Sequence, residues 1–168
     1  MKTERHDRTG AAGLSDDELI GTAREVLGLE SEALTDLSRR IGGDFVQAVR
    51  SIVSSGGTLI VCGVGKSGLV ARKIASTFAS TGTRSLFLHP ADAAHGDVGL
   101  VSEGDVVLAI SKSGASDELL SIVPLLRQIG VTVIAVTGDA ASELARSADI
   151  VLDAVDVPVL VVQGRSDA

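Results

Sequence analysis

Two short stretches of this sequence combine glycines with side chains that can hold an anion. The first reads VCGVGKSGLVARK over residues 61–73 and places Lys66 and Ser67 between two glycines. The second reads SKSGASDE over residues 111–118, where two serines flank Lys112 and a third precedes an acidic pair. Hydroxyl groups and the free N–H groups of a helix N-terminus can bind phosphate without a metal. Both stretches therefore indicate a ligand with a phosphate group or another anion.

The glycine-rich stretch alone fits more than one ligand. A Walker A nucleotide loop is excluded, because that motif needs glycine at position 60, where this sequence has Ile60. The G-x-G-x-x-G spacing agrees with dinucleotide binding, although the next strand ends in His-Pro and leaves Asp92 only loosely placed for a ribose. Lys66 could instead be a fixed cation beside an anionic substrate or intermediate. NAD(P) binding thus remains an alternative to sugar-phosphate binding.

A third stretch, HPADAAHGDVG, carries potential metal ligands. It brings His89, Asp92, His95 and Asp97 within nine residues. A metal site on so short a segment would need a tight turn, and scattered polar loop residues are the alternative interpretation.

Composition narrows the class of protein. The formal net charge of -7 argues against nucleic acid and anionic membranes as partners, since both require clustered Lys and Arg. The chain has a single cysteine, Cys62, which gives neither a disulfide framework nor a zinc knuckle and fits a reducing cytoplasm. No apolar run predicts a membrane span, and the polar N-terminus lacks the apolar core of a secretory signal.

Helical periodicity dominates the first third of the chain. We expect residues 1–13 to be a flexible tail, and Ser15 to cap a helix whose first turn is acidic. An apolar stripe then continues to Gly56-Gly57, with an interruption at Gly42-Gly43. Residues 15–55 are therefore predicted to form a helical hairpin or a kinked long helix with an apolar face to bury.

The pattern changes to alternating strands and helices over residues 57–153. Five β-branched runs begin at residues 58, 85, 105, 131 and 149, and helical segments are predicted over residues 67–81 and 116–129. Gly82 and Gly130 follow these helices as expected C′ residues, and Pro124 is expected to bend the second. This order predicts a three-layer α/β fold, with a doubly wound, flavodoxin-like or Rossmann-like parallel sheet of about five strands and added N-terminal helices. In such a sheet, ligands bind in the loops after Cys62, His89, Ile110 and Thr137.

Taken together, these stretches resemble a known family. The segments GVGKSGLVARKIASTFASTGT, LHPADAAHGDVG, SKSGASDEL and VIAVTGDAASELARSADIVLD occur in the order and spacing of the sugar isomerase (SIS) domain of D-arabinose-5-phosphate isomerases. The resemblance covers roughly residues 20–153 and implies one SIS domain over residues 14–168. It further implies interconversion of D-ribulose 5-phosphate and D-arabinose 5-phosphate, the entry to the Kdo sugar of lipopolysaccharide, without a cofactor.

The resemblance also implies roles for individual residues. Lys66 and Glu118 match catalytic positions of the family. His95 matches a position that contacts the substrate, and we assign it to the catalytic residues as well. His89 matches a position where some members hold an inhibitory zinc. Aldose–ketose isomerisation needs a base, an acid and a cation near the developing oxyanion. Glu118, kept ionised by the first turn of its helix, could be the base, and Lys66 could hold the oxyanion. The positions that match substrate-binding residues are Gly65, Ser67, Gly82, Thr83, Ser111, Ser113, Gly114 and Ser116.

The C-terminal end departs from the family pattern. The resemblance implies segments that carry a second catalytic acid and a histidine, but residues 154–168 read AVDVPVLVVQGRSDA. We also expect the paired CBS domains of many family members to be lacking. Asp153 or Asp156 could replace the acid, and this end could form a sixth strand or be disordered. The alternative function is therefore a non-catalytic module that binds or senses a sugar phosphate. In either case we expect a homodimer or homotetramer, because the helices and the sheet leave apolar surface to cover.

Overall fold

The computed structural model describes residues 14–154. The described residues divide into two units, one of residues 14–39 and one of residues 40–154. The expected tail over residues 1–13, and the expected C-terminal end beyond Ala154 with Asp156, lie outside the described residues.

The long helix α1 (Asp16–Arg40) supplies the described part of the smaller unit. The Ser15 N–H donates to the Glu18 carboxylate at 2.8 Å, and the Glu18 N–H donates to the Ser15 hydroxyl at 3.4 Å. These reciprocal bonds form a capping box, so the predicted helix start is confirmed. The backbone bond from Ser15, followed by the bond from its hydroxyl, lowers the pKa of the Glu18 carboxyl. None of the residues of α1 is buried.

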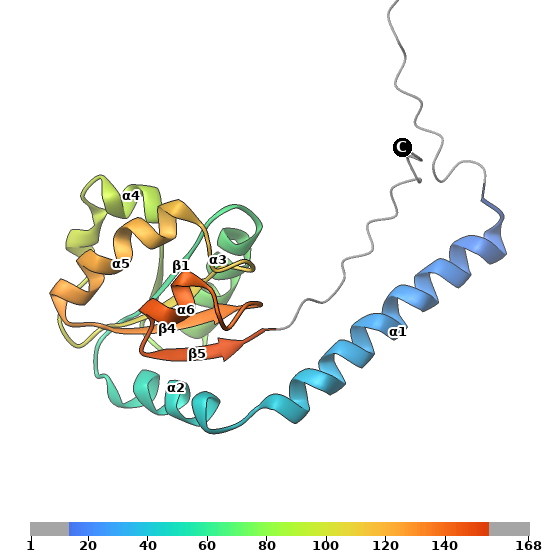
Figure 1. The fold of residues 1–168 in the computed structure, drawn as a ribbon, viewed down its shortest axis with the longest axis horizontal. Coiled ribbons are helices and arrows are strands. Elements are labelled where there is room, and N and C mark those ends of the chain that lie inside the picture. The colour runs from blue at the N-terminus through green and yellow to red at the C-terminus, as the bar shows by residue number, and fades with distance from the viewer. Residues whose placement is uncertain (1–13, 155–168) are drawn as a thin grey trace, which may run out of the picture. The chain divides into compact units, whose positions relative to one another are not determined.

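A parallel sheet of five strands forms the centre of the larger unit (Figure 1). Its strands are β1 (Leu59–Gly63), β2 (Ser85–Leu88), β3 (Val106–Ile110), β4 (Thr132–Thr137) and β5 (Ile150–Asp153). They lie in the order β2-β1-β3-β4-β5, so the direction of winding reverses between β1 and β3. The predicted doubly wound sheet is confirmed, with the strand order of flavodoxin-like folds.

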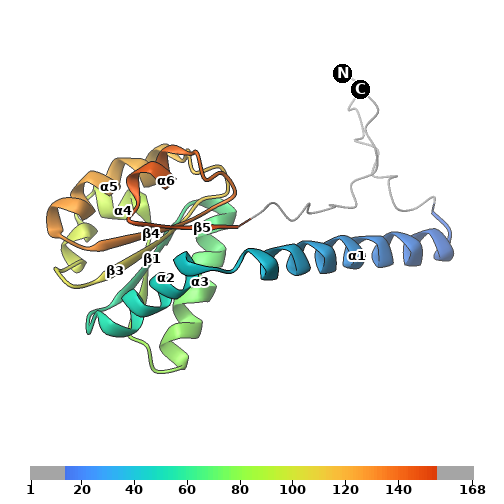
Figure 2. The same cartoon turned by 60° about the horizontal axis from the view of Figure 1, so that its bottom comes forward.

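Helices cover both faces of the sheet (Figure 2). On one face, α2 (Gly43–Ser54) and α3 (Gly65–Ser80) pack small residues such as Ala48, Ala71 and Ala75 against the strands. On the other face lie α4 (Pro90–Ala94), α5 (Asp117–Ile129) and α6 (Glu143–Ser147). A short 3-10 helix, η1 (Asp97–Leu100), follows α4. The three-layer prediction is therefore confirmed.

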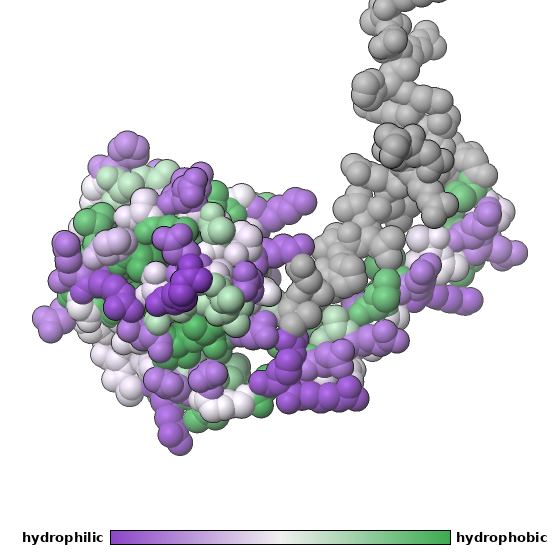
Figure 3. All heavy atoms as spheres, viewed as in Figure 1, coloured by the Kyte–Doolittle hydropathy of each residue, from purple (hydrophilic) through white to green (hydrophobic). Residues whose placement is uncertain are grey.

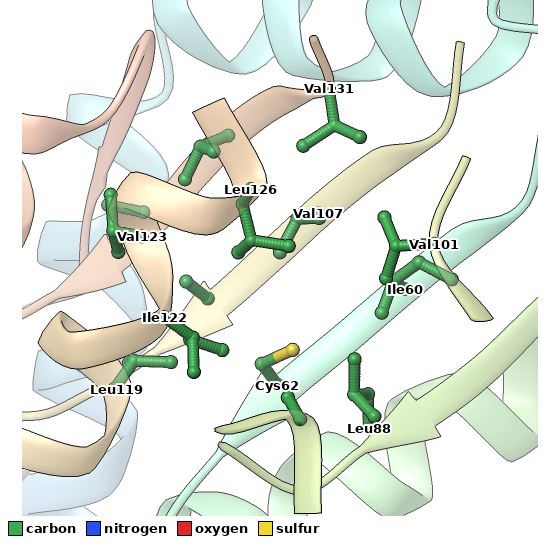
Figure 4. Close-up of a cluster of buried hydrophobic side chains, with 14 of the residues drawn as sticks. Ile60, Cys62, Leu88, Val101, Val107, Leu119, Ile122, Val123, Leu126 and Val131 are labelled. Atoms are coloured by element: carbon green, nitrogen blue, oxygen red, sulfur yellow. The ribbon is translucent and has the colours of Figure 1, made fainter. Parts of the chain in front are cut away.

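Figure 4 shows the core beneath α5, where the Cys62 thiol lies among branched aliphatic side chains. Every residue of β1 and β3 is buried, which explains why their sequences are continuous apolar runs. Removal from water disfavours the thiolate and raises the pKa of Cys62 to about 12. Cys62 is thus a packing residue with an inert thiol.

Glycines end the helices largely where the sequence predicts. Gly130 follows α5 in the left-handed region with φ of 87°, and Gly82 follows α3 with φ of 94°. Gly42 lies between α1 and α2, so the predicted break there is confirmed. Helix α3 begins two residues earlier than expected, and α5 runs through Pro124 to Ile129. Among residues 14–154, no helix combines the length and apolarity needed to cross a membrane.

Candidate functional site

The glycine loop (residues 63–68) connects β1 to α3. A Cβ atom on Gly63 would lie 2.9 Å from the carbonyl group of Ser67, and one on Gly68 would lie 2.8 Å from the Gly63 oxygen. These glycines therefore let the helix approach the strand closely, whereas Gly65 supplies a turn with φ of 57°. Lys66 follows in the first turn of α3 and is exposed.

The serine loop (residues 111–116) connects β3 to α5. The hydroxyl oxygens of Ser111 and Ser116 lie 2.9 Å apart, and Ser111 accepts a hydrogen bond from the Gly114 N–H at 3.1 Å. The Ser113 hydroxyl accepts from the Ala115 N–H at 3.3 Å. Ser111 is buried, whereas Ser113 is exposed. The expected proximity of Ser111 and Ser116 is therefore present in the structure.

The N-terminus of α5 lies beside these hydroxyls. Ser116 is the N-cap residue, but its side chain contacts Ser111 and makes no capping bond to the helix. The N–H groups of the first turn therefore keep their capacity to bind an anion. Glu118 lies in this same turn and is exposed. The N-terminus of α5 could thus bind the phosphate group of a ligand and also carry a carboxylate base, Glu118.

The histidine loop (residues 89–97) contains α4. His89 is the N-cap of α4, and its Nδ1 atom accepts from the Ala91 N–H at 3.2 Å. This bond requires a lone pair on Nδ1 and leaves Nε2 for other contacts. Phe87 contacts the His89 ring edge-on, with ring centroids 6.2 Å apart. His95 ends α4 and is exposed.

The histidine loop does not form a metal site by itself. Across residues 14–154, no three side chains of His, Cys, Asp or Glu gather closely enough to hold a metal ion. The residues present therefore do not fit a closed zinc site, and zinc binding by His89 stays a prediction that requires further ligands.

The sheet register brings the three loops to one edge. Gly63 pairs with Ile110, and Cys62 pairs with Leu88, so the glycine, serine and histidine loops leave adjacent parallel strands at their carboxyl ends. This edge contains the point where the strand order reverses, the usual place for a ligand in an open α/β sheet. The structure therefore places the glycine, serine and histidine loops at the same edge of the sheet.

Three of the residues named from the sequence lie elsewhere. Gly82 and Thr83 precede β2, at the amino edge of the sheet, whereas the glycine, serine and histidine loops lie at the carboxyl edge. Asp153 ends β5, two strands from β3, and its carboxylate accepts from Arg40 at 3.1 Å. Asp153 is therefore an ion-pair partner of Arg40 and lies apart from the serine loop.

Sequence reasoning missed two hydroxyl residues behind the serine loop. Thr137 and Ser142 are both buried and lie close to Gly114. The available signal in the sequence was the position of Thr137 at the end of a strand, since the loop after this strand is expected to face the ligand. The contact of Thr137 and Ser142 with the serine loop depends on the pairing of β3 with β4, which the residue pattern alone does not specify.

The chain matches the family model described as the SIS domain over residues 51–160. It is 47% identical, over 82% of its own length, to arabinose 5-phosphate isomerase KdsD of Pseudomonas aeruginosa, and covers 42% of that relative. It is also 46% identical, over 76% of its length, to the protein of that name from Escherichia coli K12, of which it covers 39%. The chain thus spans about two fifths of the length of these curated relatives.

The fold agrees with a solved structure that contains a ligand. A protein of Escherichia coli CFT073, solved in complex with a sugar phosphate, superposes with a TM-score of 0.80 at 37% identity. The match covers 84% of this chain and 76% of the other. The structural comparison therefore agrees with the family match on the fold of this chain.

Proposed function

The chain belongs to the SIS domain family, and from this premise we propose that it binds a sugar phosphate and interconverts D-ribulose 5-phosphate and D-arabinose 5-phosphate. The observation that carries the proposal is the pair of hydroxyls of Ser111 and Ser116, 2.9 Å apart at an uncapped helix N-terminus. This arrangement suits the phosphate group of the substrate. The curated relatives named arabinose 5-phosphate isomerase support the choice of sugar.

The proposed reaction moves a proton between C1 and C2 of the sugar. The Glu118 carboxylate removes the proton from C1 of the ketose, which leaves an enediolate, and returns it to C2 to give the aldose. The ammonium group of Lys66 stabilises the negative charge that develops on the sugar oxygen. His95 contacts the substrate and transfers the hydroxyl proton between the two oxygens. Within this scheme the product would enter the synthesis of the Kdo sugar of lipopolysaccharide.

Substrate binding also involves the backbone around these side chains. Gly65, Ser67 and Gly114 lie in the glycine and serine loops, where glycine allows a ligand to approach the backbone closely. Gly82 and Thr83 lie at the other edge of the sheet, so in the proposed assembly a second copy of the chain would supply them. This is consistent with a homodimer or homotetramer whose sites lie near an interface.

A coupled assay for arabinose 5-phosphate formation from ribulose 5-phosphate tests the proposed reaction. Turnover by the purified chain is the expected result. Calorimetry with arabinose 5-phosphate, and with unphosphorylated arabinose as the control, tests binding separately. Saturable binding of the phosphorylated sugar without turnover would indicate a binding or sensor module instead, and binding of neither sugar would contradict both functions.

A further inference from the structure

The serine loop is hydrogen-bonded to the segment that joins β4 to α6. This segment comprises residues 137–144 and is here called the β4–α6 segment. The Gly138 N–H donates to the Lys112 carbonyl at 2.9 Å, and the Leu144 N–H donates to the Gly114 carbonyl at 3.0 Å. The Thr137 hydroxyl also donates to the Lys112 carbonyl, at 3.4 Å. Two carbonyl groups of the serine loop are therefore directed at the β4–α6 segment.

The two segments are packed closely together at Gly114. A Cβ atom on this glycine would lie 2.9 Å from the Thr137 hydroxyl and closer still to the Ser142 hydroxyl. Thr137 and Ser142 are 1% and 6% exposed, so both hydroxyls are shielded from water. On the other side, a Cβ atom on Gly138 would lie 3.1 Å from the Lys112 carbonyl oxygen. A shift of the β4–α6 segment would therefore also move the serine loop.

This arrangement matters electrostatically for an anion. Carbonyl oxygens carry partial negative charge and repel phosphate, whereas N–H groups and hydroxyl protons attract it. A phosphate loop must therefore turn its carbonyls away from the ligand. Because Gly138 and Leu144 bind two of these carbonyls in the free protein, little reorganisation remains to be made when the ligand arrives.

We propose that Thr137, Gly138 and Ser142 are positioning residues that hold the serine loop ready for phosphate. The inference rests on the proposed sugar-phosphate binding and extends it to three residues that have no direct contact with the substrate in that scheme. Thr137 and Gly138 orient the Lys112 carbonyl. Ser142 confines Gly114, and it also caps α6 through a bond from the Ala145 N–H at 3.3 Å.

The first test substitutes Gly138 by alanine in the full chain. The new methyl group would push the Lys112 carbonyl, so calorimetry should give affinity for arabinose 5-phosphate and inorganic phosphate lower by about tenfold. The matched control is Gly43→Ala, because a Cβ atom there meets nothing within 4 Å. The control should bind both ligands as the parent does.

The second test removes the Thr137 hydroxyl with little change of volume. Thr137→Val should lower phosphate affinity by roughly fivefold, and Thr137→Ser, which keeps the hydroxyl, should stay within about twofold of the parent. Amide hydrogen exchange without ligand provides an independent readout. The Leu144 amide should exchange faster in Gly138→Ala and Thr137→Val, while the amides of β1 stay protected.

The outcomes separate this inference from the proposed function. Faster exchange at Leu144 together with weaker phosphate binding supports the positioning role. A parent that binds arabinose 5-phosphate, beside variants that bind it equally well, would overturn the positioning role and leave the proposed function intact. A parent that binds neither arabinose 5-phosphate nor phosphate would overturn both.

Discussion

The three serines of the serine loop differ in their surroundings. Ser111 and Ser116 engage each other, and Ser111 also accepts from the Gly114 N–H. Ser113 is exposed, and its hydroxyl accepts only the weak bond from the Ala115 N–H among the bonds that the structure shows for it. The Ser113 proton is therefore available to a ligand at no cost to the loop.

Ser113→Ala should weaken arabinose 5-phosphate binding by about 1 kcal/mol or more, which is roughly fivefold in Kd. The reason is the loss of a hydroxyl donor to a charged acceptor. Calorimetry measures the change, and Ser76→Ala, at an exposed position of α3, serves as the control. Equal affinity of Ser113→Ala and the parent would show that this hydroxyl does not contact the phosphate.

Glu118→Gln tests the proposed base. The substitution keeps the volume but loses the basic lone pair, so turnover should fall by roughly 10² or more while Kd changes little. Asp117→Asn is the matched control, since this neighbouring carboxylate lies in the same first turn and is also exposed. If Glu118→Gln leaves the rate within a few-fold of the parent, the carboxylate is a structural or orienting group.

Sequence reasoning predicted which side chains would share an edge, but not what each would contact. The serines are expected to lie together because all three follow the end of one strand, β3. The Nδ1 bond of His89 and the burial of Thr137 and Ser142 depend on atoms brought close by tertiary packing, which residue spacing does not encode. Gly82 and Thr83 were grouped with the site by resemblance, yet strand direction places them at the opposite edge.

At the scale of elements, the strands were the most predictable part of the fold. The apolar runs of β1 and β3 reflect burial on both faces, and helices α3 and α5 end at glycines. The helices α4 and α6 were not predicted, because each has five residues and shows no full helical period. Helix α3 begins at Gly65 because the positive φ of this glycine lets the chain turn directly from β1 into the helix.

Gly68→Ala should destabilise the contact between β1 and α3. A Cβ atom at this buried position would lie 2.8 Å from the Gly63 carbonyl oxygen, so the helix would have to move away from the strand. We expect the free energy of unfolding to fall by about 1–3 kcal/mol, the range typical of overpacking. Urea denaturation measures this, with Gly43→Ala as a control that should be neutral or slightly stabilising. A stable Gly68→Ala would mean that the helix can shift freely.

At the scale of the whole molecule, the buried thiol predicts a dependence of stability on pH. The pKa of Cys62 is about 12 in the folded chain and near the ordinary 9.0 in the unfolded chain. Above pH 9 the unfolded state therefore releases this proton first, and the contribution of Cys62 to stability, fully present below pH 9, is lost as pH rises towards 12.

Cys62→Ala checks this effect. The stability of the parent minus that of the variant should fall by up to about 1.4 kcal/mol per pH unit above pH 9. Urea denaturation in a reducing buffer at about pH 7 and about pH 10.5 provides the comparison. A difference that stays constant with pH would show that the thiol is accessible to water.

The proposed homodimer or homotetramer would bury the exposed apolar side chains of α2. Phe45, Val49 and Val53 recur every four residues along α2 and are 44%, 42% and 80% exposed, whereas Ala48 of the same helix is buried against the sheet. Figure 3 shows that hydrophobic residues reach the surface of this part of the chain between hydrophilic ones. A stripe of this kind on a helix is typical of a contact with another chain.

We therefore expect light scattering at micromolar concentration to give two or four times the chain mass of 17.1 kDa. Val49→Lys places a charge in the middle of the α2 stripe and should shift the mass towards one chain, because burying an unpaired ammonium is costly. Gln47→Lys adds the same charge to the same helix outside the stripe and should leave the assembly unchanged. If Gly82 and Thr83 reach the site from a second copy, Val49→Lys should also weaken arabinose 5-phosphate binding. A folded parent of single-chain mass would contradict the assembly, and unchanged binding by a monomeric Val49→Lys would assign the site to one chain.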